Sequence, residues 1–420
     1  MRRGELAARR RARGHTQETL AQRLGVNVSS VARWERGLAI PYPHVRRALA
    51  EELGLPVEEL TALLTPAADP EPAAPSESVP PSWNRRRLEA LATGLRGAQP
   101  ATDTPGHAAH AWLVTPPPAE WSWLATRIRD HHRPAIGSAT IARIRARTDY
   151  LRTADDIVAG GDLHHTIQRE LAVTAELLST TRYTDHIGRQ LLAALAELSQ
   201  LCGWSTADAA DPARATGYYL SGIAAAHAAD LPELGAELTS ALAYHLTETN
   251  GDAAEAVLVA RSALAGLRRL DAPTPRMLAM VHARLAWALN AAGETRSALD
   301  AMNRAQDHFA ARDDTRPDPG WLYWLSASEM DIIVGRFEAA THQPEAAQRR
   351  LRTSLSQCDP HHVREHTLYT TWLAHTYLDT GDTDQAADLA QHCQRLDATI
   401  DSAFSRRAVH HLTNRLTTPA

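Results

Sequence analysis

The sequence contains no lysine, and all 44 of its basic residues are arginine. With the abundance of alanine and proline, we attribute this to a GC-rich coding sequence rather than to function. Cys202, Cys358 and Cys393 are far apart and lack CxxC spacing, so we expect buried, reduced thiols in a cytoplasmic protein. No run of about 18 apolar residues occurs, which excludes a membrane helix. The first residues also lack the apolar segment of a secretion signal.

Signatures of common enzymes are also scarce, with no glycine-rich phosphate loop and no nucleophile elbow. One stretch, residues 362–366 (HVREH), matches the pattern of inverted zinc peptidases, in which two histidines bind zinc beside a glutamate base. No glutamate follows Glu365, so the third ligand of those enzymes is missing. The histidine doublets also lack partners at ligand spacing: His131-His132, His164-His165 and His410-His411. We therefore expect no catalytic residue, no metal and no cofactor.

Charge is distributed unevenly along the 420 residues. Residues 1–50 carry a net charge of +8, whereas the remaining chain carries −13. A basic head on an acidic body keeps attraction to phosphate local and prevents the body from adhering to a duplex. The charge pattern therefore favours a nucleic-acid partner for the amino-terminal part.

The most informative stretch is residues 16–37, TQETLAQRLGVNVSSVARWERG. It begins with threonine, a suitable cap for a first short helix that Gly25 ends. Asn27 is a suitable cap for a second helix, which ends at the final glycine. In that helix Val31 and Trp34 share a face towards the first helix, and the opposite face is small, polar or basic. These features are typical of a helix-turn-helix.

The motifs T-Q-E-x-L-A-x-x-L-G and W-E-R-G in this stretch are specific, and residues 4–60 resemble the Xre (phage-repressor and Cro) family of DNA-binding domains. The resemblance implies an all-α domain of five short helices over residues 1–64. It also implies that Arg10 pairs with Glu35 inside the domain, in a structural role.

By this resemblance, the start of the second helix enters the major groove of double-stranded DNA. Arg33 can bond a guanine through two hydrogen bonds, worth about 1–3 kcal/mol of discrimination, and Val28 can contact a thymine methyl. Gln17 would bond a phosphate and fix the register. The predicted DNA-binding residues are Gln17, Asn27, Val28, Ser29, Ser30, Arg33 and Arg36. Most repressors of this type bind pseudo-palindromic sites, so a homodimer is expected.

Residues 65–82, TPAADPEPAAPSESVPPS, are rich in proline and predict an extended, semi-stiff linker. Residues 83–184 are expected to be a helical connecting region that packs on the following domain. Its tryptophans, Trp112, Trp121 and Trp123, could stack on nucleic acid, but aromatic packing over the start of a helical array is the favoured interpretation.

Residues 185–420 contain a degenerate repeat of helix pairs, with turns roughly 38 to 50 residues apart. The turns lie at Asp211-Pro212, Asn250-Gly251, Gly293-Glu294, Gln343-Pro344 and Gly381-Asp382. A small residue follows each turn: Ala215, Ala256, Ala298, Ala347 and Ala386. A second small position precedes four of the turns, at Gly203, Ala286, Gly335 and Ala374, with Tyr244 as the exception. Small residues at fixed offsets allow two helices to approach closely, which is typical of stacked hairpins.

This region resembles tetratricopeptide repeats, and its combination with an Xre domain is similar to Gram-positive peptide-pheromone receptors and actinobacterial regulators. The resemblance implies an all-α regulator of transcription whose repeat domain dimerises and senses a peptide or small signal. In the alternative hypothesis, the repeat domain only dimerises or docks a protein partner, without a small ligand.

The first helix of each repeat would line the concave wall of such an array. Alignment of the repeats on their turns places Trp204, His245, Trp287, Arg336 and His375 in one column, with Asp208, Glu248, Asn290 and Asp379 beside it. Aromatic, cationic and amide groups would suit the carbonyls and terminus of a short peptide. The predicted ligand-binding residues are Trp204, His245, Trp287, Asn290, Arg336 and His375.

Overall fold

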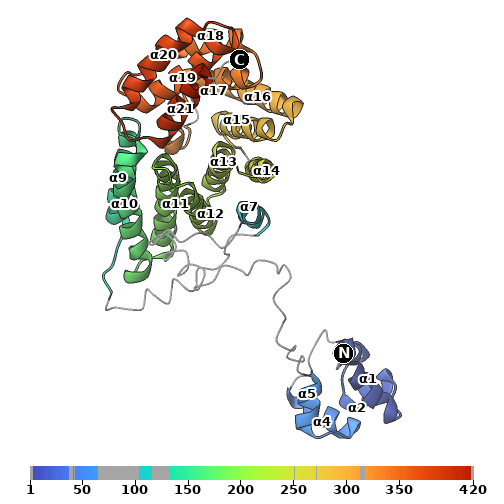
Figure 1. Ribbon diagram of the computed structural model, residues 1–420. Coiled ribbons are helices and arrows are strands. Elements are labelled where there is room, and N and C mark those ends of the chain that lie inside the picture. The colour runs from blue at the N-terminus through green and yellow to red at the C-terminus, as the bar shows by residue number, and fades with distance from the viewer. Residues whose placement is uncertain are drawn as a thin grey trace. The chain divides into compact units, whose positions relative to one another are not determined.

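The computed structural model describes residues 3–36, 41, 43–64, 104–115, 133–249, 251–270, 272–312 and 317–417. The described part is all-α, as the sequence predicts, and its only β-type pairing is an isolated bridge between Ala135 and Arg182. It divides into two compact units, within Met1–Val79 and Pro80–Ala420 (Figure 1). Several predictions lie outside the described residues: the linker 65–82, the end of the second helix at Gly37, and the packing of Trp121 and Trp123.

The amino-terminal unit contains five short helices, as predicted. They are α1 (Arg3–Ala12), α2 (Gln17–Leu24), α3 (Val28–Arg36), α4 (Pro43–Leu53) and α5 (Val57–Leu64). Thr16 caps α2, because its hydroxyl accepts from the N–H of Thr19, and Gly25 ends the helix at φ 64°. Val31 and Trp34 are buried, 1% and 4% exposed, in one core with α1, α2, α4 and α5. The predicted helix-turn-helix is therefore formed.

The carboxy-terminal unit is a stack of helices. They are α7 (Pro105–Val114), α9 (Ser138–Asp155), α10 (Gly160–Thr180), α11 (Asp185–Asp208), α12 (Pro212–Ala228), α13 (Pro232–Glu248), α14 (Ala253–Leu267), α15 (Pro275–Ala291), α16 (Thr295–Ala310), the short 3₁₀ helix η1 (Gly320–Leu322), α17 (Ala327–Ala340), α18 (Pro344–Leu355), α19 (Val363–Asp379), α20 (Thr383–Asp397) and α21 (Ala403–Thr417). Antiparallel hairpins form from α11 to α20, and their turns lie where the repeat predicts them.

Tight turns set the register of these hairpins. The turn has three residues in the hairpins that begin with α11, α15, α17 and α19. It runs from the C-cap of the first helix to the N-cap of the second. Their middle residue has a positive φ: Ala210 at 67°, Gly293 at 76°, His342 at 61° and Gly381 at 82°. The turn between α13 and α14 is one residue longer, from Thr249 to Asp252. This extra residue shifts the register of α13 relative to its turn.

The small residues of the repeat lie where the helices of a hairpin meet. The alanines that follow the turns, Ala215, Ala256, Ala298, Ala347 and Ala386, are 0% exposed. A Cβ on Gly203 would lie 2.7 Å from the ring of Tyr219, and one on Gly335 would lie 3.0 Å from Leu351. In α13 the buried small residue is Ala243, also 0% exposed, so the exception that the sequence placed at Tyr244 comes from the longer turn. The small position is therefore occupied in all five hairpins.

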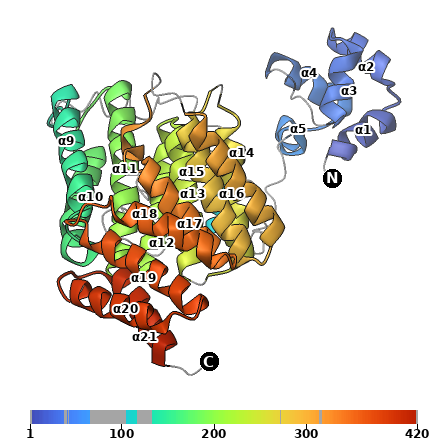
Figure 2. The same cartoon turned by 90° about the horizontal axis from the view of Figure 1, so that it is seen from above.

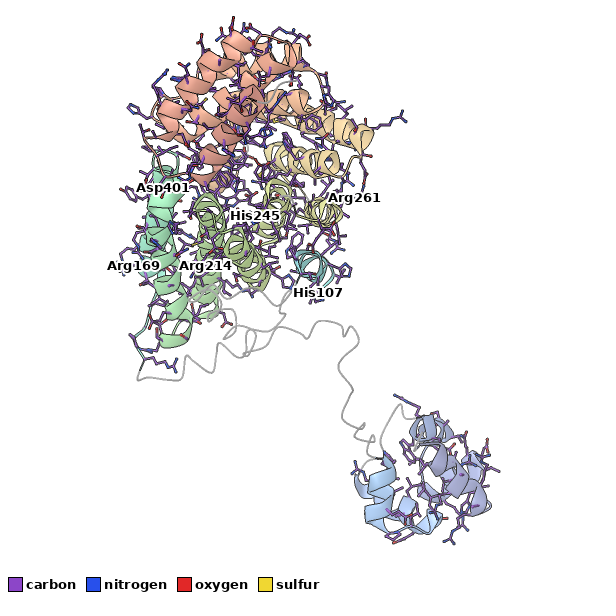
Figure 3. The ribbon with its side chains drawn as sticks, in the orientation of Figure 1. His107, Arg169, Arg214, His245, Arg261 and Asp401 are labelled. Carbon is purple, nitrogen blue, oxygen red and sulfur yellow. The ribbon has the colours of Figure 1, made fainter. Side chains whose placement is uncertain are left out.

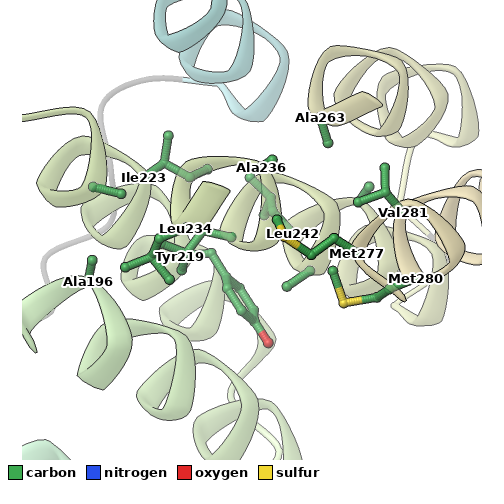
Figure 4. Close-up of a cluster of buried hydrophobic side chains, with 14 of the residues drawn as sticks. Ala196, Tyr219, Ile223, Leu234, Ala236, Leu242, Ala263, Met277, Met280 and Val281 are labelled. Atoms are coloured by element: carbon green, nitrogen blue, oxygen red, sulfur yellow. The ribbon is translucent and has the colours of Figure 1, made fainter. Parts of the chain in front are cut away.

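The main core runs continuously from α7 and α9 to α17. Alanine, leucine and methionine side chains interdigitate between neighbouring helices, as Figure 4 shows for Leu234, Leu242 and Met277. Trp112 on α7 lies against α13 and α14, where a Cβ on Gly235 or Gly266 would come within 2.3 or 2.1 Å of its indole. The prediction that Trp112 is a packing residue is thereby confirmed.

The row of helices closes on itself, because α19 contacts α9, α21 contacts α11, and Asp401, just before α21, contacts α10 (Figures 1 and 2). Arg364 on α19 donates to the backbone oxygen and Oδ2 of Asp155 on α9, at 2.9 and 3.1 Å. Near the start of α10, the N–H of Gly161 donates to the carbonyl of Asp401 at 2.8 Å (Figure 3). These contacts join residues about two hundred positions apart in the chain.

Asp208 is the centre of this closure. It is 0% exposed, and Ser402, the N–H of Phe404 and the N–H of Gly160 all donate to its carboxylate, at 2.6, 3.0 and 2.9 Å. The repeat alignment predicts that Asp208 faces inward, beside the column of predicted ligand-binding residues. In the structure it holds α10, α11 and α21 together instead. None of the described helices is both long enough and apolar enough to span a bilayer.

Candidate functional site

The first candidate site is the outer surface of α3. Asn27, Val28, Ser29 and Arg33 are exposed, and Ser30 is half-buried. Asn27 Oδ1 accepts from the N–H and the hydroxyl of Ser29, at 2.9 and 2.8 Å, so its carbonyl caps the helix and its NH₂ group is left for an external acceptor. Arg33 forms no ion pair with any residue in the described ranges. The side chain of Arg36 lies outside the described part.

Buried polar contacts fix the orientation of α3. Arg10 Nε donates to Glu35 Oε1 at 2.6 Å, which confirms the structural pair that the family resemblance implied. Gln17 Nε2 donates to Glu35 Oε2, also at 2.6 Å. Gln17 was predicted to bond a phosphate, and this contact leaves it one N–H for that purpose. The same carboxylate thus ties the start of α2 to α3.

Ion pairs elsewhere in the unit leave the outer surface of α3 cationic. Arg9 pairs with Glu59 and Arg23 with Glu52, at 3.2 and 2.9 Å. Glu52 of α4 and Glu59 of α5 therefore pair with arginines other than Arg33. An exposed, unpaired guanidinium beside small polar side chains at a helix start is suited to read base edges in a major groove.

The second candidate site is a cavity of about 1130 Å³ inside the closed array. The first helix of each hairpin contributes to its wall, as do α9, α21, the segment from Trp321 to Ser326 and the segment between α18 and α19. Five of the ten tryptophans of the chain line it: Trp204, Trp287, Trp321, Trp324 and Trp372. The cavity therefore combines large aromatic surfaces with charged groups.

Arg336 lies in the middle of this wall. Its Cζ lies 4.3 Å from the ring centroid of Trp287 and 4.4 Å from that of Trp372, so the guanidinium is sandwiched between two indoles. Nη1 donates to the hydroxyl of Tyr244 and Nη2 to Glu248, both at 2.7 Å. Burial alone would lower the pKa of Arg336, but Glu248 and Tyr244 outweigh it and raise the pKa. The residue is permanently charged and rigidly held.

His375 and His411 line another part of the cavity. Arg415 Nη1 contacts His375 Nδ1 at 3.1 Å, and His375 Nε2 lies 3.2 Å from His411 Nδ1. An arginine can only donate, so His375 Nδ1 accepts and its Nε2 carries the proton. Burial, together with His411 and Arg415, lowers the pKa of His375 to about 4, which keeps the ring neutral.

The structure brings five of the six predicted ligand residues together: Trp204, Trp287, Asn290, Arg336 and His375 all line the cavity. His245 does not line it. Its side chain is 5% exposed on the face of α13 towards α12, where Nε2 contacts the carbonyl of Pro212 at 3.0 Å (Figure 3). Tyr244 takes the cavity position instead, because the longer turn after α13 shifts the alignment by one residue.

Residues 362–366, which match the zinc-peptidase pattern, contact neighbouring side chains of the array. Glu365 pairs with Arg364 at 2.7 Å, and the ring of His366 packs edge-on against His392, with centroids 6.0 Å apart. Across the described ranges no cluster of three or more potential ligands could hold a metal ion.

Sequence comparison matches residues 6–60 to a helix-turn-helix family model. No curated protein and no solved structure matches the chain. The family match coincides with α1 to α5, and the exposed face of α3 fits the groove-binding role of that family. The amino-terminal unit is a DNA-binding helix-turn-helix domain of a transcription regulator.

Proposed function

We propose that this regulator binds double-stranded DNA as a homodimer and that its helical array receives a peptide or small-molecule signal in the central cavity. The observation that carries the proposal is that one chain contains both features. Arg33 on α3 is exposed and forms no ion pair with a described residue, and the helical array contains an aromatic cavity of about 1130 Å³. Cavities of this size accommodate drug-sized ligands.

The closed array favours a small signal over a docked protein. Contacts of Arg364 with Asp155 and of Ser402 with Asp208 join the two ends of the row of helices. A folded partner would have to break these buried bonds to reach the indoles, whereas a compact ligand would not. A regulator that only docks a protein partner remains the alternative, and its partner would bind the outer surface.

Nothing in this proposal requires catalysis, and we assign the chain no enzymatic activity, no cofactor and a cytoplasmic location. Its test begins with genome-wide mapping of the DNA fragments that the purified full chain retains at low and at moderate salt. Sequence-specific retention that weakens as salt rises supports a DNA-binding regulator. Uniform retention of all fragments would refute it.

Dimerisation and signalling are tested on the same preparation. The chain has a mass of 45.9 kDa, and light scattering after size exclusion should give twice that value. In a separate footprinting experiment, the protected region of bound DNA should be two-fold symmetric. An extract of low molecular mass should raise the melting temperature and change DNA affinity, because a ligand that binds the folded state stabilises it. If only the macromolecular fraction has an effect, the docking alternative is correct.

A further inference from the structure

One end of the cavity holds more carboxyl groups than cations. Four carboxyls line this end: Asp155 at the end of α9, Asp156 directly after it, Glu329 on α17 and Glu365 on α19. One guanidinium, that of Arg364, pairs with two of them, at 3.1 Å to Asp155 and 2.7 Å to Glu365, and also with the fully buried Asp208 at 3.4 Å. Arg152 also lines the cavity, but it pairs with Asp149 and Glu197. We call this the acidic end.

The side-chain hydrogen bonds of two of these carboxyls, Asp156 and Glu329, come from phenols. The hydroxyl of Tyr323 donates to Asp156 Oδ2 at 2.7 Å, and that of Tyr369 donates to Glu329 Oε2 at 2.6 Å. Neither carboxyl forms an ion pair with a residue that the structure describes. Burial, and then the neighbouring carboxyls, raise the pKa of Glu329 to about 7, although a hydrogen bond from Tyr369 opposes the rise. Burial raises the pKa of Asp156 as well.

Asp155 gives a second, independent indication. Its side chain is 5% exposed and lines the cavity, and Arg364 binds only its Oδ2. Oδ1 is buried and accepts no hydrogen bond from the described residues. A buried carboxylate oxygen without a donor is costly, and a donor placed in the cavity would offset that cost.

Aromatic rings border the acidic end. The ring centroid of Trp372 lies 5.3 Å from that of Tyr369, and Trp204 faces Arg364. Trp321 and Trp324 enter the cavity from the same short segment as Tyr323. Carboxylates without an ion-pair partner among the described residues, next to the faces of indoles, are the surroundings that an organic ammonium group prefers.

We infer that the acidic end binds the protonated amine of the signal, with Glu329 and Asp156 as the anionic partners and the neighbouring indoles covering its apolar part. This inference rests on the proposed function, since it names the chemistry of the ligand in the same cavity. The ammonium is supplied either by a small organic amine or by the free amino terminus of a peptide.

Matched pairs of probes test the inference on the full chain by isothermal titration calorimetry. Tryptamine is compared with tryptophol, which carries a hydroxyl in place of the amine, and a leucine tripeptide amide with its amino-acetylated form. We expect at least one charged member to bind on the order of tenfold to a hundredfold more tightly than its neutral partner, the range of a charge-assisted hydrogen bond. The pair that discriminates identifies the source of the amine.

Variants assign the effect to the acidic end. Glu329→Gln and Asp156→Asn keep the size of each side chain and its acceptor oxygen for the tyrosine, but remove the negative charge. Each should reduce the discrimination at least severalfold, whereas Glu345→Gln, at an exposed carboxyl on α18, should leave it unchanged. Melting curves of all variants establish that they remain folded.

The inference is overturned if no amine binds at about 1 mM, if charged and neutral probes bind equally, or if the discrimination survives in both variants. DNA binding is measured in parallel. Intact specific DNA binding with no amine discrimination defeats only this inference, whereas loss of specific DNA binding in the wild-type chain defeats the proposed function.

Discussion

Replacement of Arg364 by methionine tests whether the buried ion cluster closes the array. Methionine keeps the unbranched stem of the side chain but removes the guanidinium, whose carbon lies 5.6 Å from the ring centroid of Trp204. The substitution leaves Asp155, Asp208 and Glu365 without their shared cation. Loss of one partner of a buried ion pair costs about 3–5 kcal/mol, because the other charge stays buried and uncompensated.

Urea denaturation gives this loss in the free energy of unfolding. The loss should grow with pH, because burial raises the pKa of Asp155 and the ionised form of this carboxyl, which is favoured as the pH rises, would lack its cation. Hydrogen exchange locates the effect: the amides of Gly161 and Phe404, which bond across the closure, should exchange faster than amides of α15 and α16. Arg349→Met, at an exposed residue of α18, is the matched control and should cost little.

A loss below about 1 kcal/mol at neutral pH would refute the reasoning, since that is the size expected of a surface pair. Uniformly faster exchange over the whole unit would also contradict it. That result would mean that Arg364 stabilises the fold in general and not the junction of α9, α19 and α21.

Three further outcomes are expected. Ala210→Gly should stabilise the chain by about 1 kcal/mol in urea denaturation, because residue 210 has φ 67°, whereas Ala209→Gly, at φ −87°, should destabilise it. Arg33→Ala should lose about 1–3 kcal/mol of discrimination between the best and a mutated DNA site, with Arg395→Ala unchanged, as measured by fluorescence anisotropy. The pKa of Glu329 is raised from 4.5 to about 7, so the folded state binds its proton more tightly than the unfolded state. Wild-type stability should therefore fall by at most about 3 kcal/mol as the pH rises through this window, and Glu329→Gln should remove that part of the pH dependence.

Local signals in the sequence account for the parts of the fold that were predicted correctly. The cap at Thr16 and the glycine at position 25 define α2 through contacts within a few residues. The alanines after each turn, such as Ala298, repeat because every hairpin has the same steric requirement at that point. Such features depend on short separations along the chain, where spacing alone determines which side chains meet.

The misplacement of His245 has an equally local cause. The alignment assumed that every hairpin turn has one length, but the turn from Thr249 to Asp252 contains an extra residue. Because successive helix positions are rotated by about 100°, a shift of one residue exchanges the cavity face for the hairpin face. The small residue Ala243, one position before Tyr244, was the signal that could have corrected the register.

The closure and the acidic end had no such signal. Arg364 and Asp155 are 209 residues apart, and Tyr323 meets Asp156 across 167 residues. Their meeting depends on the accumulated rotation of all the hairpins between them, which no spacing rule in one repeat reveals. Glu329 was overlooked because a single glutamate in the first turn of a helix is ordinarily a favourable surface residue.

The closure and the acidic end share their carboxyls, which links the two parts of the proposal. Asp155 binds Arg364 through Oδ2 and also lines the cavity, so a charge added in the cavity would act on the junction directly. A cation bound there would offset the repulsion among Asp156, Glu329 and Glu365, and it would bind the closed array more tightly than an open one. By linkage, the same ligand shifts the population towards the closed array. A signal of this kind would therefore act by fixing the junction of α9, α19 and α21, and a neutral ligand of equal affinity for both states would leave it unchanged.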